Sequence, residues 1–101
     1  MRMTVTATKL TDAVVLTVVG RLDTTTAPQL ESTIKVSAKG VKQLIIDLEN
    51  VEYISSAGLR VVLVSHKLMA GQGAKMVVRN PSPFCKQVFS ATGMDGVLNI
   101  Q

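Results

Sequence analysis

The sequence predicts an α/β fold: a mostly parallel β-sheet, begun by an antiparallel hairpin at one edge, with helices packed on it. Strand-like and helix-like stretches alternate along most of the chain, as expected of strands joined by helical crossovers. Residues 44–48 form a short apolar run, typical of a strand covered on both sides. Only the turn at 9–12 separates the first two strands, which favours an antiparallel hairpin whose first strand lies at the sheet edge.

The hairpin strands differ in character. Threonines alternate with apolar residues over 3–8, which indicates a half-buried strand with one wet face. Residues 13–19 are apolar on both faces apart from Thr17, and we expect this strand to end within 20–23.

The first helix is expected to begin at Thr26. Thr26 and Gln29 have the spacing of a capping box, with threonine as the N-cap and glutamine at N3. Gly40 is a natural stop. The expected apolar stripe comprises Ala27, Leu30, Ile34 and Ala38.

The second half of the chain repeats the strand–helix order. After the strand at 44–48 we expect a helix over 59–70, and then a buried strand at 75–79. The apolar stripe expected for that helix comprises Leu59, Val62, Leu63, Met69 and Ala70. A short helix is expected between the N-cap Ser82 and the stop Gly93, and residues 97–100 are expected to be a terminal strand or an ordered tail. The stripe of that short helix is expected to comprise Phe84, Val88 and Ala91.

Composition limits the classes of function. The 101 residues are expected to form a single domain over 1–101, with a core of aliphatic residues because aromatic residues make up only 3%. No run approaches the ~18 apolar residues of a membrane span, and no signal peptide is expected. The single cysteine, Cys85, favours a reducing cytoplasm. The net charge of +4 comes from scattered Lys and Arg residues without a stacking set, so nucleic-acid binding is not expected.

No catalytic, metal or cofactor site is expected. Ser56 and His66 would lie on one helix, about 15 Å apart by helix rise, whereas a nucleophile and its base need ~3 Å. His66, the only histidine, is interpreted as a satisfied core or boundary residue. The stretch 55–58 is too short for a phosphate-binding loop of the Walker type. Asp23 and Asp47 are both expected near strand ends, either facing a ligand or supporting turns, and the residues leave both alternatives open.

The junction between strand 44–48 and the helix after it contains two serines, Ser55 and Ser56. A hydroxyl at a helix start could be a cap, a nucleophile or a phosphate acceptor. As an N-cap, either serine would contribute about 0.5–2 kcal/mol and would need no further role.

The helix that follows carries more apolar residues than one buried face requires. Arg60 and Lys67 occupy a narrow strip, with Val64 beside it, followed by Leu68 and Val61. Either a second layer covers this flank, or it is exposed and forms a partner surface that the serines could switch.

Three motifs resemble the STAS domains of bacterial anti-sigma factor antagonists. They are GRLD at 20–23, LIIDLENV at 44–51 and YISSAGL at 53–59, and the similarity covers nearly the whole chain. The Ser-x-Gly-Leu junction is the most specific part. The resemblance implies a STAS-type layer fold and a non-enzymatic, cytoplasmic switch.

In this family the unphosphorylated protein binds an anti-sigma factor, often a serine kinase, and the sigma factor is released. The kinase phosphorylates one serine and ends the complex, and a PP2C-type phosphatase restores it. The resemblance implies that Ser56 is the phosphoacceptor. Two departures concern its neighbours: Ser55 stands where the family often has aspartate, and Ala57 where it often has a second serine. The expected partner-binding residues are Asp23, Ser55, Ala57, Gly58, Arg60, Val64, Lys67 and Leu68.

Two alternatives stay open. One is a STAS subunit of another assembly, such as a lipid-transport complex, which would bind its partner without a phosphorylation cycle. The other is a small nucleotide-binding enzyme that uses Asp23 and Asp47.

Overall fold

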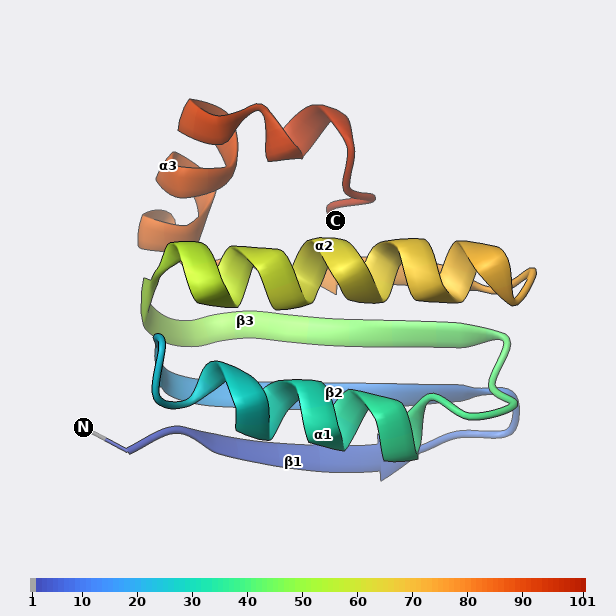
Figure 1. The fold of residues 1–101 in the computed structure, drawn as a ribbon. Coiled ribbons are helices and arrows are strands. Elements are labelled where there is room, and N and C mark those ends of the chain that lie inside the picture. Colours follow the sequence, from blue (N-terminus) through green and yellow to red (C-terminus); the bar gives the residue numbers. More distant parts are fainter. Residues whose placement is uncertain (1) are drawn as a thin grey trace.

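The computed structural model describes residues 2–101 and contains a four-stranded sheet with strand order β1-β2-β3-β4 (Figure 1). The strands are β1 (Thr4–Lys9), β2 (Ala13–Leu22), β3 (Gln43–Ile54) and β4 (Lys75–Arg79). The helices are α1 (Ala27–Ser37), α2 (Ser56–Gly71) and α3 (Pro83–Thr92), followed by a 3₁₀ turn, Met94–Gly96. β1 is antiparallel to β2, and the other two pairs are parallel, which confirms the predicted mixed sheet with its edge hairpin.

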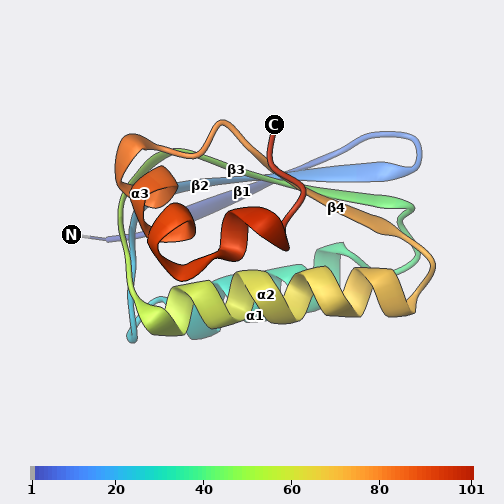
Figure 2. The same cartoon turned by 90° about the horizontal axis from the view of Figure 1, so that it is seen from above.

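Helices α1 and α2 lie side by side on one face of the sheet (Figures 1 and 2). α3 lies beside the carboxyl half of β3, where the shorter β4 has ended, and the Ser82 N–H donates to the Leu48 carbonyl at 3.1 Å. Within residues 2–101, no helix lies on the opposite face (Figure 2). Helices therefore cover residues 44–48 on one side only, and the expectation that this strand is covered on both sides is wrong. On the helix-free face, Val15 and Val77 lie on either side of Ile45 in register. Ile45 is half-buried because these two neighbouring side chains shield it from solvent.

The core lies between the sheet and the two helices and is aliphatic, as the composition predicts. Its largest fully buried aliphatic side chains include Leu16, Leu22, Leu30, Ile34, Leu44, Ile46, Leu48 and Met69. One aromatic ring joins them, Phe89, which is 1% exposed.

β3 extends further than the sequence predicts, whereas β2 ends within the predicted range. β2 ends at Leu22, and β3 continues beyond 48 as far as Ile54. The pair shifts register between Thr17/Val19 and again between Gly20/Arg21. Glu49 and Asn50 are polar residues of the kind found in turns, but they lie within β3. The irregular pairing with β2 keeps them in the strand.

α1 has the predicted stripe but not the predicted cap. Ala27, Leu30, Ile34 and Ala38 are all buried. Thr26 is the N-cap residue, but its side chain makes no capping hydrogen bond. Its hydroxyl instead donates to the Arg21 carbonyl at 2.8 Å and accepts from the Asp23 N–H at 2.8 Å. The predicted capping box is wrong because the preceding loop engages the threonine.

α2 begins three residues earlier than predicted, at Ser56. Val62 and Met69 are buried as expected, but Ala70 is exposed. Val61, expected on the outer flank, is only 7% exposed.

α3 is rotated relative to the prediction. Its buried residues are Cys85 and Phe89, whereas Phe84 is 37% exposed and Ala91 is exposed. Both sets have helical spacing, and the ten-residue helix has too few apolar residues to separate them by pattern. Burying the Phe89 ring, together with Cys85, decides the rotation. Gly93 ends the helix with φ 77°, as predicted.

Residues 97–101 form an ordered tail along β4. Ile100 makes a single parallel bridge to Val78. The Val78 N–H donates to the Asn99 carbonyl at 2.8 Å, and the Gln101 N–H donates to the Val78 carbonyl at 2.9 Å. The tail therefore covers the β4 edge. In the part of the chain that the structure describes, none of the helices is both long and apolar enough to span a bilayer.

Candidate functional site

The candidate site lies where β3 passes into α2. Leu22 and Ile54 are neighbours in the parallel register, and the Ser55 N–H donates to the Leu22 carbonyl at 2.9 Å. Asp23 and Ser55 thus follow the carboxyl ends of adjacent parallel strands. Open α/β sheets present loops for binding at this edge.

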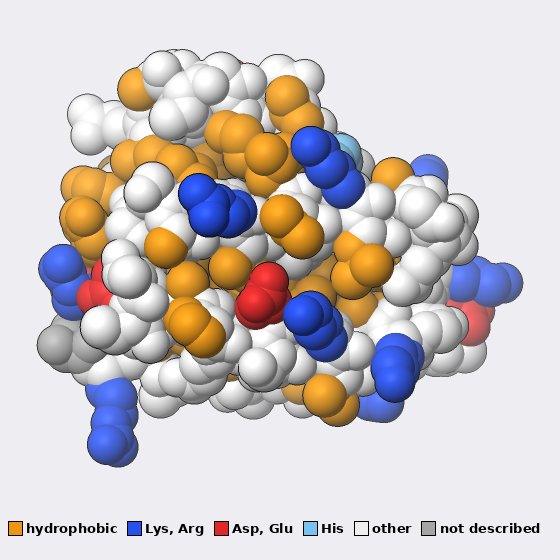
Figure 3. All heavy atoms as spheres, in the orientation of Figure 1, with side chains coloured by type: hydrophobic (Ala, Val, Ile, Leu, Met, Phe, Trp, Pro, Cys, Tyr) orange, Lys and Arg blue, Asp and Glu red, His pale blue; other side chains and the backbone are white. Residues whose placement is uncertain are grey.

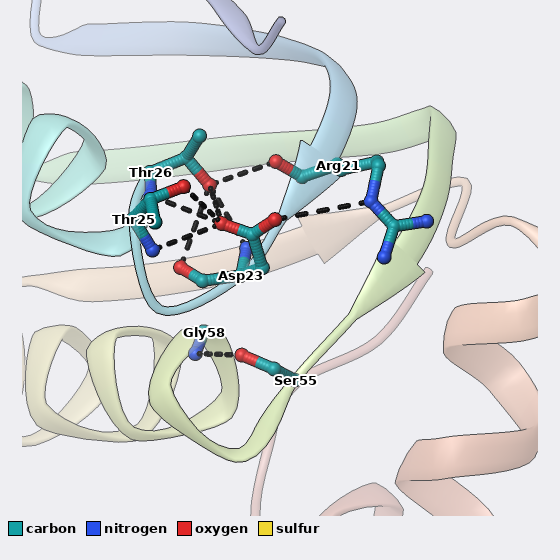
Figure 4. A network of polar contacts seen from close by, with 6 residues as sticks. All are labelled: Arg21, Asp23, Thr25, Thr26, Ser55 and Gly58. Atoms are coloured by element: carbon teal, nitrogen blue, oxygen red, sulfur yellow. Dashed lines mark hydrogen bonds and ion pairs between the residues drawn. The ribbon is translucent and has the colours of Figure 1, made fainter. Parts of the chain in front are cut away.

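The two serines of the junction have different environments. Ser55 is the N-cap of α2, with extended backbone, and its Oγ accepts from the Gly58 N–H at 3.4 Å (Figure 4). Ser56 is the first helical residue, and its side chain is exposed. Among residues 2–101, no hydrogen bond engages the Ser56 hydroxyl. The capping role therefore belongs to Ser55, and the Ser56 hydroxyl is free for chemistry.

Gly58 allows the first turn of α2 to lie against β2. A Cβ added at Gly58 would lie 2.7 Å from Leu22 Cγ, 2.9 Å from the Leu22 carbonyl oxygen and 3.0 Å from Ile54 Cγ1. No side chain fits there without a shift of the backbone. Gly58, expected at the partner surface, is buried, and Ala57 beside it is half-buried. The glycine of the motif therefore fixes how the serines are presented.

Asp23 organises the loop between β2 and α1 (Figure 4). Its Oδ1 accepts from the Thr25 hydroxyl at 2.7 Å, the Thr25 N–H at 2.9 Å and the Thr26 N–H at 3.2 Å. The Thr25 hydroxyl, the largest influence, lowers the pKa of Asp23 below its ordinary value. Its Oδ2 lies 3.8 Å from Arg21 Nε. Of the two interpretations of Asp23, these contacts favour the turn-supporting one.

Asp47 is not part of this site. It lies in the middle of β3, opposite Thr17, and is 8% exposed. Its carboxylate accepts from Arg79 Nε at 3.0 Å and from the Glu49 N–H at 3.0 Å. Asp23 lies six residues beyond Thr17 along the chain, roughly 20 Å by strand rise. The expectation that both aspartates lie at strand ends is therefore wrong for Asp47, which lies well away from Asp23 along the sheet.

The outer surface of α2 is both apolar and basic. Val64 and Leu68 are 47% and 40% exposed, and Arg60 and Lys67 are exposed beside them. Figure 3, which views the molecule from the α1 and α2 side, shows orange and blue side chains intermixed over this surface. The flank is thus exposed, apart from Val61.

His66 lies at a boundary, as predicted, but is not satisfied. It is half-buried, and its Nδ1 is buried without a hydrogen-bond partner in the described chain. Nor do residues 2–101 contain a group of His, Cys, Asp and Glu side chains that could hold a metal ion.

The sequence interpretation missed a cluster of three side chains at the same end of the sheet. The Arg21 guanidinium lies over the Tyr53 ring, 4.2 Å from its centroid, and the Tyr53 and Phe84 rings are 5.3 Å apart. The chain has only one tyrosine and two phenylalanines, so their scarcity is the one signal that the sequence offers. Their proximity was not predictable, because Phe84 was assigned to the buried stripe of α3.

Comparisons with known proteins identify a family for this chain. The model of the STAS domain family matches residues 4–101. BtrV of Bordetella bronchiseptica, which is named as an anti-sigma factor antagonist, is 32% identical over 92 residues, covering 90% of this chain and 79% of that protein.

Solved structures show the same fold. An anti-sigma factor antagonist from Mycobacterium paratuberculosis is 28% identical and superposes with a TM-score of 0.88, covering 98% of this chain and 85% of that one. SpoIIAA in its unphosphorylated form, at 22% identity, has a TM-score of 0.82 over 97% of this chain and 88% of its own. The phosphorylated form has a TM-score of 0.76 over 97% and 91%. With the family model matched over nearly its whole length, the chain belongs to the STAS domain family.

Proposed function

We propose that this protein is a cytoplasmic anti-sigma factor antagonist controlled by phosphorylation of Ser56. When Ser56 is unmodified, the protein binds an anti-sigma factor that is also a serine kinase, and the sigma factor is released. Phosphorylation by that kinase ends the complex, and a PP2C-type phosphatase restores it. The protein itself is a binding partner and catalyses no reaction.

The observation that carries the proposal is the division of labour between the two serines. The Ser55 hydroxyl is engaged with the Gly58 N–H, whereas the Ser56 side chain is exposed at the first helical position. A kinase must reach the hydroxyl that it modifies, so Ser56 is the better acceptor. The relatives named as anti-sigma factor antagonists support the role of the protein as an antagonist.

A phosphate at Ser56 would change the surface more than the fold. It would add about −1.5 to −2 charges at a helix N-terminus, where the dipole and free N–H groups tolerate negative charge. Because the Ser56 side chain is exposed, the phosphate displaces no packed group. A partner surface pressed against this position would have to desolvate a dianion, which costs several kcal/mol when the charge is unpaired.

The partner surface that we propose extends from the junction along the outer side of α2. Its exposed members other than Ser56 are Arg60, Val64, Lys67 and Leu68. Ala57 and Ser55 lie half-buried at the junction, Asp23 supports the neighbouring loop, and the buried Gly58 contributes through the backbone. A surface of this character suits a partner with apolar and acidic side chains.

The experiment is a phosphorylation and binding assay with the anti-sigma factor kinases encoded in the same genome. Each kinase is incubated with ATP and with wild type, Ser56→Ala or Ser55→Ala, and the modified residue is identified by mass spectrometry. We expect one kinase to modify Ser56 in wild type and in Ser55→Ala. Ser56→Ala should stay unmodified and should keep binding that kinase when ATP is present.

Two outcomes would contradict the proposal. Quantitative modification of Ser55 with Ser56 untouched would move the acceptor to the neighbouring serine. Binding to a partner without any phosphorylation would instead favour a STAS subunit of another assembly.

A further inference from the structure

The two edges of the sheet differ in how they are protected. Within residues 2–101, β1 pairs only with β2, whereas the opposite edge strand, β4, is covered by the tail at 97–101 (Figure 1). An open edge presents a row of free N–H and C=O groups, which proteins usually protect with proline, bulges or several charges. β1 has no proline, its register with β2 is regular from end to end, and its only charged residue is Lys9. Its threonines and valine favour further strand pairing.

The hairpin determines which backbone groups of β1 point outward. The Leu10 N–H donates to the Ala13 carbonyl at 2.8 Å, so these two residues form a hydrogen-bonded pair. Such pairs alternate along an antiparallel ladder, so the three threonines of β1 direct their backbone groups toward β2. The other residues of the strand, Val5, Ala7 and Lys9, therefore direct their N–H and C=O groups away from the sheet.

These outward groups match those of a second copy of the chain. A twofold axis perpendicular to the sheet places two β1 strands antiparallel and keeps both helix layers on one side. With Ala7 opposite the partner's Ala7, each Val5 lies opposite the partner's Lys9, and the outward groups of all three residues are paired. The two lysines are then four positions apart, about 13 Å by strand rise. Their repulsion is screened at physiological salt, where the screening length is about 8 Å.

The same register brings opposite charges together at both ends of the paired strands. Continued beyond β1, it puts Arg2 of each copy beside the partner's hairpin turn, which contains Asp12. Arg2 and Asp12 are exposed, and neither forms an ion pair in the part of the chain that the structure describes. Their backbones are held by β2 and the start of β3: a Cβ on Gly20 would collide with the Arg2 carbonyl, and the Asp12 carbonyl accepts from the Lys42 N–H at 2.7 Å.

A hollow beside β1 has room for the side chain of the partner's Lys9. It has a volume of about 490 Å³ and is lined by Arg2, Met3, Thr4, Val5 and Gln29. The partner's Lys9 lies opposite Val5 in this register, and opposite residues of an antiparallel pair point to the same face. The alkyl stem of the lysine covers Val5, with its ammonium group toward the Gln29 amide.

We propose that this protein forms a homodimer through its β1 strands, with Ala7 at the twofold axis and Arg2 paired with the partner's Asp12. A six-residue strand spans about 20 Å, so the interface is smaller than the ~800 Å² per partner of a stable complex, and we expect a dissociation constant on the order of 10–100 µM. β2 separates β1 from the β3–α2 junction, so Ser56 stays exposed in the dimer. The inference therefore does not rest on the proposed function.

Sedimentation velocity measures the dimer over a concentration series that brackets the expected dissociation constant. Arg2→Glu and Asp12→Lys each bring like charges together, and the double variant restores opposite charges. We expect at least fivefold weaker association for each single variant and recovery to within twofold of wild type for the double variant. Lys86→Glu is the matched control, because Lys86 is exposed on α3 and the net charge changes by the same amount as in Arg2→Glu. It should change association less than twofold.

Ala7→Pro tests the centre of the paired strands. It removes an outward N–H that the β1–β2 ladder does not use, a position at which edge strands tolerate proline. We expect at least tenfold weaker association, and a urea unfolding curve confirms that the variant is folded. In wild type, hydrogen exchange followed by NMR should be at least fivefold slower at high than at low protein concentration for the amides of Val5, Ala7 and Lys9.

Four outcomes would overturn the proposal. Wild type could stay monomeric over the whole series. A dimer that Ala7→Pro and Arg2→Glu leave intact, or whose newly protected amides lie outside β1, would be formed by another surface. Equal weakening by Lys86→Glu and Arg2→Glu would be an effect of net charge. A double variant as weak as its single variants would show that Arg2 and Asp12 do not pair, and the register would be wrong.

Discussion

Helices α2 and α3 of this protein have the same kind of serine N-cap, but the two helix starts have different surroundings. In α2, Ser55 accepts from the N–H of Gly58, and in α3, Ser82 accepts from the N–H of Cys85. Ser82 is 7% exposed and its hydroxyl also donates to the Val51 carbonyl, so the start of α3 is locked to β3. The start of α2 is open, and the residue after its cap, Ser56, is exposed.

The difference shows that a serine cap is not by itself a sign of function. The cap of α3 is saturated by structural contacts and leaves no group for a partner or an enzyme. The cap of α2 makes one long hydrogen bond, and its neighbour has none. What distinguishes a candidate switch is a second hydroxyl that the fold does not use.

The largest expected effect is the loss of the buried cap in Ser82→Ala. This change removes a cap and leaves the carbonyl of fully buried Val51 without its partner. We expect the free energy of unfolding to fall by about 2–3 kcal/mol in urea denaturation. Ser90→Ala, an exposed change within α3, is the control and should stay within about 0.5 kcal/mol. A loss for Ser82→Ala no larger than that of the control would mean that the start of α3 is not locked.

The next effect concerns the glycine that brings α2 against β2. Gly58→Ala places a methyl group 2.7 Å from Leu22 Cγ and 2.9 Å from the Leu22 carbonyl oxygen. Overpacking of this kind costs about 1–3 kcal/mol, and the better helix propensity of alanine offsets up to about 1 kcal/mol. We expect a net loss of about 1–2 kcal/mol by urea denaturation.

Gly71→Ala provides the matched control for this change. Nothing lies within 4 Å of a Cβ at Gly71, the last residue of α2. It should be neutral or slightly stabilising. A Gly58→Ala variant as stable as Gly71→Ala would show that the junction has room to relax and that Gly58 does not fix the serines.

A smaller effect is expected for the open cap. Ser55→Ala removes one hydrogen bond of 3.4 Å from a half-buried position. We expect a loss of about 0.5–1 kcal/mol, at the low end for N-caps. The comparison with Ser82→Ala, measured under identical conditions, tests the contrast between the two helix starts directly. Equal losses in the two variants would remove the distinction.

The sequence predicted the sheet, the hairpin and the order of helices, because these follow from local apolar periodicity and turn residues. It placed the end of β3 too early, because the irregular pairing near Glu49 and Asn50 depends on contacts between strands. The rotation of α3 depends on where Phe89 finds space, which no local pattern contains.

The candidate site was predictable only in part. Helical geometry placed Val64 and Leu68 on the flank away from the expected core stripe, and the structure shows that this flank is exposed and not covered by a second layer. Which serine is the cap, and which is free, required the structure, since Ser55 and Ser56 are identical in type and adjacent in sequence. The cluster of Arg21, Tyr53 and Phe84 joins three elements that lie far apart in the chain, so it could not be found from any one stretch.

The smallest effect on stability is expected for phosphorylation of Ser56, although its effect on binding should be large. Favourable interaction of the phosphate with the helix dipole contributes only about 0.3–1 kcal/mol. The urea midpoint of the phosphorylated protein should therefore lie close to that of unmodified protein and of Ser56→Ala. Affinity for the anti-sigma factor should fall at least tenfold, which corresponds to about 1.4 kcal/mol.

Amide chemical shifts distinguish a surface change from a conformational one. Ser56 is exposed, while Val62 and Met69, which anchor α2 in the core, point inward from later turns. Their packing does not involve the phosphate, so we expect shift changes confined to residues 54–61. Changes that extend to β4, on the far side of β3 from β2, would require movement of the sheet itself. Shifts of that extent, or a collapse of the urea midpoint, would show that phosphorylation acts by refolding the domain, and the open helix start would then be a hinge and not a fixed surface.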